Sequence, residues 1–242
     1  MNSPRHVVLI HGAWHGAWCF SALQQELDRR GVPSYALDLP GHGASVENLR
    51  DLAGDAEAVC DFLQVLAERG ITDPVLVGHS YGGAVISQAA ASGPAVDSLV
   101  YLAAFALQAG ESVMSTLATF PHHEVVLGSA IQMGDDGTSI LDPSAARSAL
   151  YGSCDESTID AAVSRLTPQP MATMVQALTD SALGRIYSTY VVCSQDQAVH
   201  PAHQEIMALR CSNSITLDTD HSPFISMVKE TADIIEQHAL RT

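Results

Sequence analysis

The sequence predicts an α/β fold, a mostly parallel doubly wound sheet with a helical insertion. Three observations carry this prediction. Short apolar runs alternate with helical patterns over the first hundred residues, which is typical of βαβ units. The alternation stops after Phe105 and resumes with the run 186–193. The 242 residues also suffice for one large domain that carries an insertion.

The elements of the first hundred residues follow from their apolar patterns. Strands are expected at 6–10, 33–37, 74–79 and 97–102, and helices at 18–30, 47–69 and 82–91. The strand runs lack polar alternation, as expected when both faces of a parallel sheet are covered. The helix 47–69 is the clearest, because its apolar residues recur at spacings of three and four. These residues are Leu49, Leu52, Ala56, Val59, Leu63 and Leu66.

The second half divides into an insertion and a return to the sheet. Residues 106–183 have no comparable apolar strand run, but they hold short helical patterns and a turn at 134–137. The alternation then resumes with a strand at 186–193, a helix at 202–209, a strand at 214–217 and a last helix at 223–240. We therefore expect a core domain formed by residues 1–105 and 184–242, and a helical cap, or lid, formed by residues 106–183.

Composition excludes several classes of protein. Hydrophobic residues make up 47% and charged residues 16%, which is the reverse of a disordered chain. The formal charge is 11 − 27 = −16, which argues against nucleic acid or an anionic membrane as partner. Ten of the eleven basic residues are arginine, and Lys229 is the only lysine.

The cysteines and the lengths of the apolar runs indicate the cellular compartment in which the protein is expected. Five cysteines, far apart and with no CxxC pair or zinc-type spacing, are expected to be free thiols. The apolar run at 7–10 is too short for a signal peptide, and the longest, 99–107, is too short for a membrane span. A cytoplasmic, soluble protein is expected. The cysteines are Cys19, Cys60, Cys154, Cys193 and Cys211.

The pattern Gly78-His79-Ser80-Tyr81-Gly82 lies directly after an expected strand and directly before an expected helix. In this setting the G-x-S-x-G pattern indicates a nucleophile, because the sharp turn lifts the serine hydroxyl clear of the sheet. Glycines two positions away on either side relieve the crowding. Ser80 is therefore the candidate nucleophile.

His221 is the candidate base. It follows the expected strand 214–217 by a short loop and precedes a helix, which places it at the carboxyl edge of the sheet. Ser222 is interpreted as the N-cap of that helix, with Pro223 in its first turn. Other histidines are interpreted as surface residues: His122, His123, His200, His203 and His238.

An acid is needed to orient the imidazole, and Asp196 lies just past the strand that ends at Cys193. The chain order serine, aspartate, histidine is that of α/β hydrolases. Asp218 and Asp220 are competitors, but a residue so close in sequence rarely reaches its neighbour's ring. The position after the strand 97–102 holds Ala103-Ala104, so no acid stands there.

Acyl transfer also needs N–H donors where the oxyanion forms. One candidate is the backbone amide of Tyr81, which follows the nucleophile. The other is the amide of Ala13, in the loop after the first strand.

Three motifs, HGAWHGAW at 11–18, DLPGHG at 38–43 and GHSYG at 78–82, carry a resemblance to the α/β-hydrolase superfamily. More narrowly, the chain resembles the plant methylesterase and hydroxynitrile lyase family and its bacterial esterase relatives. The resemblance covers nearly the whole sheet domain and is weakest over 106–183. It implies the α/β-hydrolase fold. It also implies the triad Ser80, Asp196 and His221, with the amides of Ala13 and Tyr81 as oxyanion donors.

Two features of the lyases in this family are absent here. Those lyases carry a lysine directly after the catalytic histidine and a threonine directly before the first oxyanion donor. This chain has Ser222 and Gly12 at those positions, and Lys229 lies eight residues beyond His221, about two helical turns away. The resemblance therefore favours an esterase over a hydroxynitrile lyase.

The expected function is a serine carboxylesterase that cleaves small esters, methyl-type or short-chain, through an acyl-enzyme, with no cofactor and no metal. The alternatives are a lactone, thioester or natural-product hydrolase with the same triad, and a small-molecule binding protein of hydrolase fold. The expected partner is a small-molecule ester substrate, and a homodimer is left open. The expected substrate pocket comprises Gly12, Trp14, Phe105, Met114, Leu117, Phe120, Met171 and Leu178.

Overall fold

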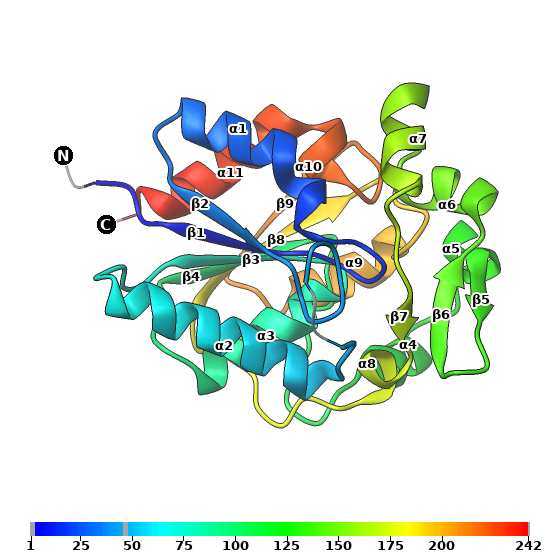
Figure 1. The fold of residues 1–242 in the computed structure, drawn as a ribbon, viewed down its shortest axis with the longest axis horizontal. Coiled ribbons are helices and arrows are strands. Elements are labelled where there is room, and N and C mark those ends of the chain that lie inside the picture. Colours follow the sequence, from blue (N-terminus) through cyan, green and yellow to red (C-terminus); the bar gives the residue numbers. More distant parts are fainter. Residues whose placement is uncertain (1–2, 46–47, 242) are drawn as a thin grey trace.

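A computed structural model describes residues 3–45 and 48–241, and its centre is a parallel six-stranded sheet (Figure 1). The strand order is β2-β1-β3-β4-β8-β9, so the chain runs outward from β1 to β2 and then crosses back to β3. Every neighbouring pair is parallel. This confirms the predicted fold class. The strands are β1 (Val7–Ile10), β2 (Ser34–Leu37), β3 (Val75–His79), β4 (Ser98–Leu102), β8 (Tyr187–Cys193) and β9 (Asn213–Leu217).

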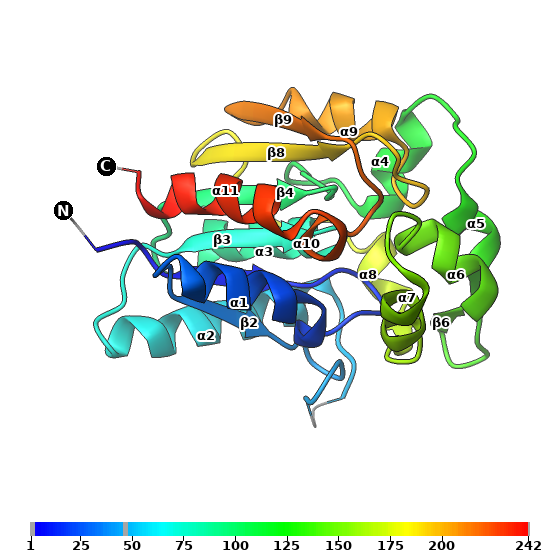
Figure 2. The same cartoon turned by 90° about the horizontal axis from the view of Figure 1, so that it is seen from above.

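Helices cover both faces of this sheet (Figure 2). On one face α1 (Ser21–Arg29) packs beside α11 (Val228–Ala239), and on the other lie α2 (Leu52–Glu68), α3 (Gly82–Ser92) and α9 (Pro201–Ala208). Successive residues of a strand point to opposite faces of the sheet. Val75 and Val77 pack in the apolar cluster on one face, and Leu76 packs in the cluster on the other. Fully buried strands of this kind explain the absence of polar alternation in the sequence.

Residues 106–183 gather at the carboxyl ends of the strands (Figure 1). This segment contains three strands that the sequence pattern did not predict. They are only two to four residues long and carry no apolar run, although the expected turn at 134–137 does connect the first two. Its helices are α4 (Val113–Thr119), α5 (Val126–Ala130), α6 (Pro143–Leu150), α7 (Glu156–Val163) and α8 (Ala172–Val175). Its antiparallel sheet is β5 (Ile131–Met133), β6 (Thr138–Leu141) and β7 (Gln169–Pro170).

Three predicted helices have different bounds in the structure. The helix expected at 18–30 is a 3-10 helix, η1 (Ala17–Phe20), followed by α1. The helix expected from residue 47 begins at Leu52, because the Asp51 carboxylate caps it by accepting from the Gly54 N–H at 2.9 Å; position 47 itself lies outside the described residues. The last helix is divided into α10 (Pro223–Ser226) and α11 by Met227, whose φ and ψ of −133° and 58° are not helical.

Two histidines predicted at the surface are buried. His238 is 4% exposed, because its ring nitrogens bond the hydroxyls of Ser98 and Thr189 at 2.9 and 2.8 Å. His203 is 7% exposed, and its Nε2 atom bonds the Pro121 carbonyl at 2.7 Å. Polar partners inside the fold account for both errors, and such partners leave no trace in the local sequence.

The five cysteines form no disulfide with one another. Burial raises the pKa of each thiol, to about 12 at Cys154 and about 11 at Cys211. Among the described residues, no helix is both long and apolar enough to cross a bilayer.

Candidate active site

Ser80 lies in the turn between β3 and α3. Its φ is +50°, in the left-handed region that non-glycine residues rarely adopt. A Cβ on Gly78 would come within 2.6 Å of the Gly82 carbonyl oxygen, and one on Gly82 within 2.5 Å of the Ile10 oxygen. The close approach of α3 to the sheet therefore requires both glycines. The Ser80 N–H donates to the Leu102 carbonyl at 3.1 Å, which holds the turn over the sheet.

Asp196 and His221 are in direct contact although 25 residues separate them. Asp196 follows β8 and His221 follows β9, so neighbouring parallel strands bring both to the carboxyl edge of the sheet. The His221 Nδ1 atom donates to Asp196 Oδ2 at 2.7 Å. In a neutral imidazole this leaves Nε2 as the proton acceptor.

The Asp196 carboxylate is held by three further donors. Its Oδ1 atom accepts from the backbone N–H groups of Ala198 and Val199, at 2.6 and 2.9 Å. Its Oδ2 atom accepts from Gln204 Nε2 at 2.8 Å, in addition to His221. Sequence reasoning missed Gln204, because a single polar residue on a helix gives no signal of what it contacts.

The two competing acids are bonded elsewhere. Asp220 is buried, and it accepts from the backbone N–H groups of Ser222 and Ser153 at 3.0 and 2.8 Å. Asp218 is an exposed carboxylate whose partners are side chains that follow β8. In the part of the chain that the structure describes, neither carboxylate is hydrogen-bonded to the His221 ring, so the geometry favours Asp196 as its partner.

His79 supports the loop that carries His221. Its Nε2–H donates to the His221 carbonyl at 2.9 Å, and the two ring centroids are 4.5 Å apart. Burial places the pKa of His79 well below the ordinary value, so its ring is neutral at physiological pH. The residue before the candidate nucleophile thus contacts the candidate base.

The loop after β1 is held by its own histidines. His11 donates from Nδ1 to the Gly12 carbonyl at 2.8 Å, and His15 donates from Nδ1 to the Ala13 carbonyl at 2.8 Å. Burial lowers their pKa values to about 3 and about 4, so both rings are neutral. The Nε2 atom of His15 is then free to accept from the Tyr151 hydroxyl at 2.8 Å.

The two amides expected to bind an oxyanion are not used by the fold. Within residues 3–45 and 48–241, no acceptor is bonded to the backbone N–H of Ala13 or of Tyr81. A Cβ on Gly12 would lie 2.9 Å from the Ser80 Cβ, so the loop and the serine turn are packed against each other. The geometry therefore allows both amides to serve one group bound at Ser80.

The Tyr81 side chain is anchored to α2. Its hydroxyl donates to Asp55 Oδ2 at 2.7 Å, and both side chains are buried. Burial raises the pKa of Asp55 to about 7, while the bond from Tyr81 opposes that change. Sequence reasoning treated residue 55 only as part of the helix 47–69, and missed this pair.

An apolar cavity of about 110 Å³ opens over Ser80, Ala13 and Tyr81. Of the residues that the structure describes, those that line it include no charged side chain. Five of the predicted pocket residues contribute: Trp14, Phe105, Met114, Leu117 and Met171. The remaining lining comes from Val113, Leu127, Ile131, Met174, Ala198 and Val199.

Gly12, Phe120 and Leu178 are not among the described residues that line this cavity. Gly12 is packed behind Ser80. Phe120 contacts the His203 ring at 5.3 Å, and Leu178 is buried in the large apolar cluster. Apolar character alone did not separate lining residues from packed ones.

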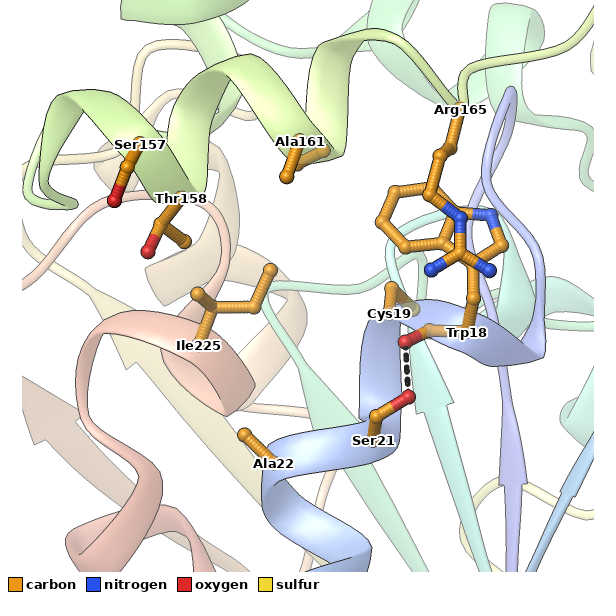
Figure 3. Close-up of a pocket in the computed structure, with 10 residues that line it drawn as sticks. Trp18, Cys19, Ser21, Ala22, Ser157, Thr158, Ala161, Arg165 and Ile225 are labelled. Carbon is orange, nitrogen blue, oxygen red and sulfur yellow. Dashed lines mark hydrogen bonds between the residues drawn. The ribbon is translucent and has the colours of Figure 1, made fainter.

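A larger and more open hollow, of about 310 Å³, lies between α7 and the pair η1–α1 (Figure 3). At this hollow the Arg165 guanidinium lies over the Trp18 ring, 4.7 Å from its centroid. None of the predicted catalytic residues lines this hollow. Of the three, Ser80 lines the smaller cavity. The larger hollow is a contact between the 106–183 segment and the sheet domain.

A family model described as Alpha/beta hydrolase family matches residues 7–234. The chain belongs to the alpha/beta hydrolase family. This agrees with the parallel sheet, the serine turn after β3 and the acid and histidine after β8 and β9, which are the features of an alpha/beta hydrolase.

Similar alpha/beta hydrolases include esterases from plants and bacteria. Methylesterase 9 of Arabidopsis thaliana is 26% identical, over 95% of this chain and 96% of its own length. A carbendazim hydrolyzing esterase of Nocardioides is 38% identical over 46% of each chain. The structure of a pyrethroid hydrolase from Sphingobium faniae superposes with a TM-score of 0.83 at 25% identity, covering 97% of both chains.

Proposed function

We propose that this alpha/beta hydrolase is a serine carboxylesterase. The observation that carries the proposal is the Asp196–His221 pair, 2.7 Å apart, at the sheet edge where the strained Ser80 turn meets an apolar cavity. The esterases and hydrolases among its relatives support the same reaction class.

In the proposed mechanism, His221 Nε2 removes the Ser80 proton as the hydroxyl oxygen attacks the ester carbonyl. Asp196 keeps the His221 proton on Nδ1 and stabilises the imidazolium that forms. The amides of Ala13 and Tyr81 donate to the oxyanion. His221 then protonates the departing alcohol, and a water activated by the same residue hydrolyses the acyl-enzyme.

The cavity favours small neutral esters. A volume of about 110 Å³ holds a short or compact acyl group. The lining drawn from residues 3–45 and 48–241 is apolar, with no charged side chain to pair with an ionic substrate. Because half of the residues that line the cavity lie within 106–183, we also propose that residues 106–183 form the cap that sets acyl-group selectivity.

A hydroxynitrile lyase is disfavoured. The hydroxynitrile lyases of the plant methylesterase and hydroxynitrile lyase family carry a lysine directly after the catalytic histidine. Here that position is Ser222, at the N-cap of α10, and the lysine of this chain, Lys229, lies further on, in α11. A threonine at position 12 would bring its Cβ within 2.9 Å of the Ser80 Cβ.

The test is hydrolysis of p-nitrophenyl acetate, butyrate and octanoate, with methyl esters assayed by acid release. We expect turnover by the wild type, faster with the short acyl chains, and loss of at least roughly a thousandfold in Ser80→Ala. Ser92→Ala, at the end of α3, is the matched control. Turnover of lactones or thioesters but not of simple esters would instead support the alternative function, a lactone or thioester hydrolase with the same triad. Ligand binding without turnover of any substrate would make this chain a binding protein and would overturn the proposal.

A further inference from the structure

Trp14 is held in a strained conformation. Its φ is +62°, in the left-handed region that is unfavourable for a bulky side chain. Such a conformation persists only where surrounding bonds determine it. Trp14 directly follows Ala13, and the peptide plane that joins them contains the Ala13 carbonyl and the Trp14 N–H. The Ala13 N–H lies in the preceding plane, which meets this one at the Ala13 Cα. A bond that fixes the Trp14 N–H therefore restrains the direction of the Ala13 N–H through the φ and ψ angles of Ala13.

The bonds that hold Trp14 come from the 106–183 segment. Its backbone N–H donates to Gln169 Oε1 at 3.1 Å, and its carbonyl accepts from the Thr167 N–H at 2.8 Å. Its indole N–H donates to the Ser139 carbonyl and hydroxyl oxygens, both at 3.2 Å. Of these partners, Gln169 is the one whose side chain contacts the Trp14 backbone at the amide that adjoins Ala13.

The orientation of the Gln169 amide is fixed by its partners. A backbone N–H can only donate, so the atom that faces Trp14 must be the side-chain oxygen. Gln169 Nε2 then donates to the Thr173 hydroxyl at 2.9 Å. Gln169 is 1% exposed and Thr173 is fully buried, so neither bond can be replaced by bulk water.

The Gln169–Thr173 pair also lies near Tyr81, whose backbone amide is the second proposed oxyanion donor. The Thr173 hydroxyl accepts from Gln169 and donates to the Pro170 carbonyl at 2.6 Å. It lies near enough to the Tyr81 phenol to oppose the effect of burial, which raises the pKa of Tyr81. That phenol is bonded to Asp55 at 2.7 Å. The Gln169–Thr173 pair therefore lies between Trp14 and Tyr81, and so between the residues that supply both sides of the proposed oxyanion hole.

We propose that Gln169 is a positioning residue that sets the direction of the Ala13 amide through its bond to the Trp14 backbone. The inference rests on the proposed serine esterase. It means that the oxyanion hole is completed jointly by the sheet domain and the 106–183 segment. Gln169 does not line the cavity, so it acts through Trp14 and Ala13 and not by contact with substrate.

The test separates substrate binding from transition-state stabilisation. Loss of a complete oxyanion donor costs roughly 10²–10³ in kcat. A misdirected donor should cost less, so in Gln169→Leu we expect kcat to fall about tenfold to a hundredfold while KM changes by less than about threefold. Inhibition by a trifluoromethyl ketone, which forms an oxyanion on Ser80, should weaken by the same factor as kcat/KM. Gln169→Glu keeps an oxygen facing Trp14 and should recover part of the loss.

Two further variants keep the proposal falsifiable if Gln169→Leu does not fold. Thr173→Val removes the second anchor of Gln169 and should lower kcat by a smaller factor. Ser139→Ala removes the hydroxyl bonds to the indole and to the Gln169 carbonyl but leaves the Gln169 side chain on the Trp14 backbone. It should leave kcat within about twofold, since the Ser139 carbonyl still accepts from the indole. Unchanged kcat and unchanged ketone inhibition in folded Gln169→Leu and Thr173→Val would overturn the proposal, as would a loss confined to KM. Absence of turnover by the wild type would instead overturn the serine esterase on which it rests.

Discussion

At the scale of single residues, buried polar side chains determine what each reactive group can do. Asp196 illustrates this, because the backbone of Ala198 and Val199 holds one of its oxygens and leaves the other for His221 and Gln204. Sequence reasoning could identify the acid and the histidine from their places after strands. It had no means of finding the donors that orient them.

Asp196→Asn should lower kcat by roughly 10³–10⁴ with little change in fold. The two backbone N–H groups require the amide oxygen of asparagine at the Oδ1 position. Its NH₂ group therefore faces His221 and pushes the ring proton to Nε2, where it blocks proton transfer from Ser80. The same NH₂ group cannot accept from Gln204 Nε2, so that bond is lost too. Ester turnover and far-UV circular dichroism measure the two effects.

Asp218→Asn is the matched control for that variant, since Asp218 is an exposed acid bonded to Ser194 and Gln195. It should keep the wild-type kcat. Equal losses in the two variants would show that Asp196 has no special role.

Asp55→Asn should change how stability depends on pH. The pKa of Asp55 is about 7 in the folded protein, against 3.8 ordinarily. Between these values the folded protein keeps a proton that the unfolded chain releases. The contribution of the Asp55 proton to the free energy of unfolding is therefore fully present below pH 4 and is lost as the pH rises through 7. The asparagine variant cannot ionise, so its Tm should exceed that of the wild type at pH 8 and match it at pH 4.

Asp61→Asn, which removes an exposed carboxyl from the same helix, is the control and should follow the wild type. Parallel Tm curves for the wild type and Asp55→Asn from pH 4 to pH 8 would contradict the assignment.

At the scale of elements, the close packing of α3 on the sheet positions Ser80. Its first residue, Gly82, has no room for a side chain, because a Cβ would lie 2.5 Å from the backbone oxygen of Ile10. A backbone atom cannot move aside as a flexible side chain can. The glycines of the serine turn are therefore structural requirements of this helix and strand pair.

Gly82→Ala should lower the free energy of unfolding by at least about 2 kcal/mol, as expected for overpacking against the backbone. Gly128→Ala in α5 is the matched change, because no atom of the described part of the chain lies within 4 Å of its added Cβ. It should be neutral or should stabilise by up to about 1 kcal/mol. Urea unfolding of both variants measures the difference, and equal effects would show that the crowding at Gly82 is relieved at little cost.

Elements with long local patterns were predictable, and those that depend on tertiary contacts were not. Fully apolar strand runs and the G-x-S-x-G spacing are readable in the sequence, so the sheet and the Ser80 turn followed from it. The strands β5, β6 and β7 are too short to form a pattern. Gln169 and Gln204 are isolated polar residues whose partners lie 155 residues and 8 residues away. Only folding brings these partners together.

At the scale of the whole molecule, buried neutral histidines make stability sensitive to acid. Burial lowers the pKa to about 3 at His11 and to about 4 at His15, His42 and His238, against 6.5 ordinarily. Below pH 6.5 these histidines bind protons in the unfolded chain but stay neutral in the folded protein. Their contribution to the free energy of unfolding is therefore fully present above pH 6.5 and is lost as the pH falls toward 4. Asp55 acts in the opposite direction over part of this range.

We therefore expect the free energy of unfolding to fall steeply from pH 6.5 to pH 4.5. His79, whose pKa burial also lowers, is a fifth such histidine. Five histidines less one carboxyl leave a net difference of four protons, or roughly 5 kcal/mol for each pH unit. Urea titrations at pH 7, 6 and 5 measure the slope, and His238→Gln should reduce it by about one proton. A free energy of unfolding that stays constant from pH 7 to pH 5 would contradict this expectation.

The raised pKa values of the five thiols have a practical consequence. A thiol with a pKa of 11 or 12 is almost entirely protonated at pH 7, and only the thiolate reacts rapidly with maleimides and disulfide reagents. The native protein should therefore react slowly with Ellman's reagent and yield five equivalents only in denaturant. One cysteine introduced at the exposed Ile140 of β6 would then take a fluorophore selectively. Such a label would report how the 106–183 segment moves while the rest of the molecule stays unmodified.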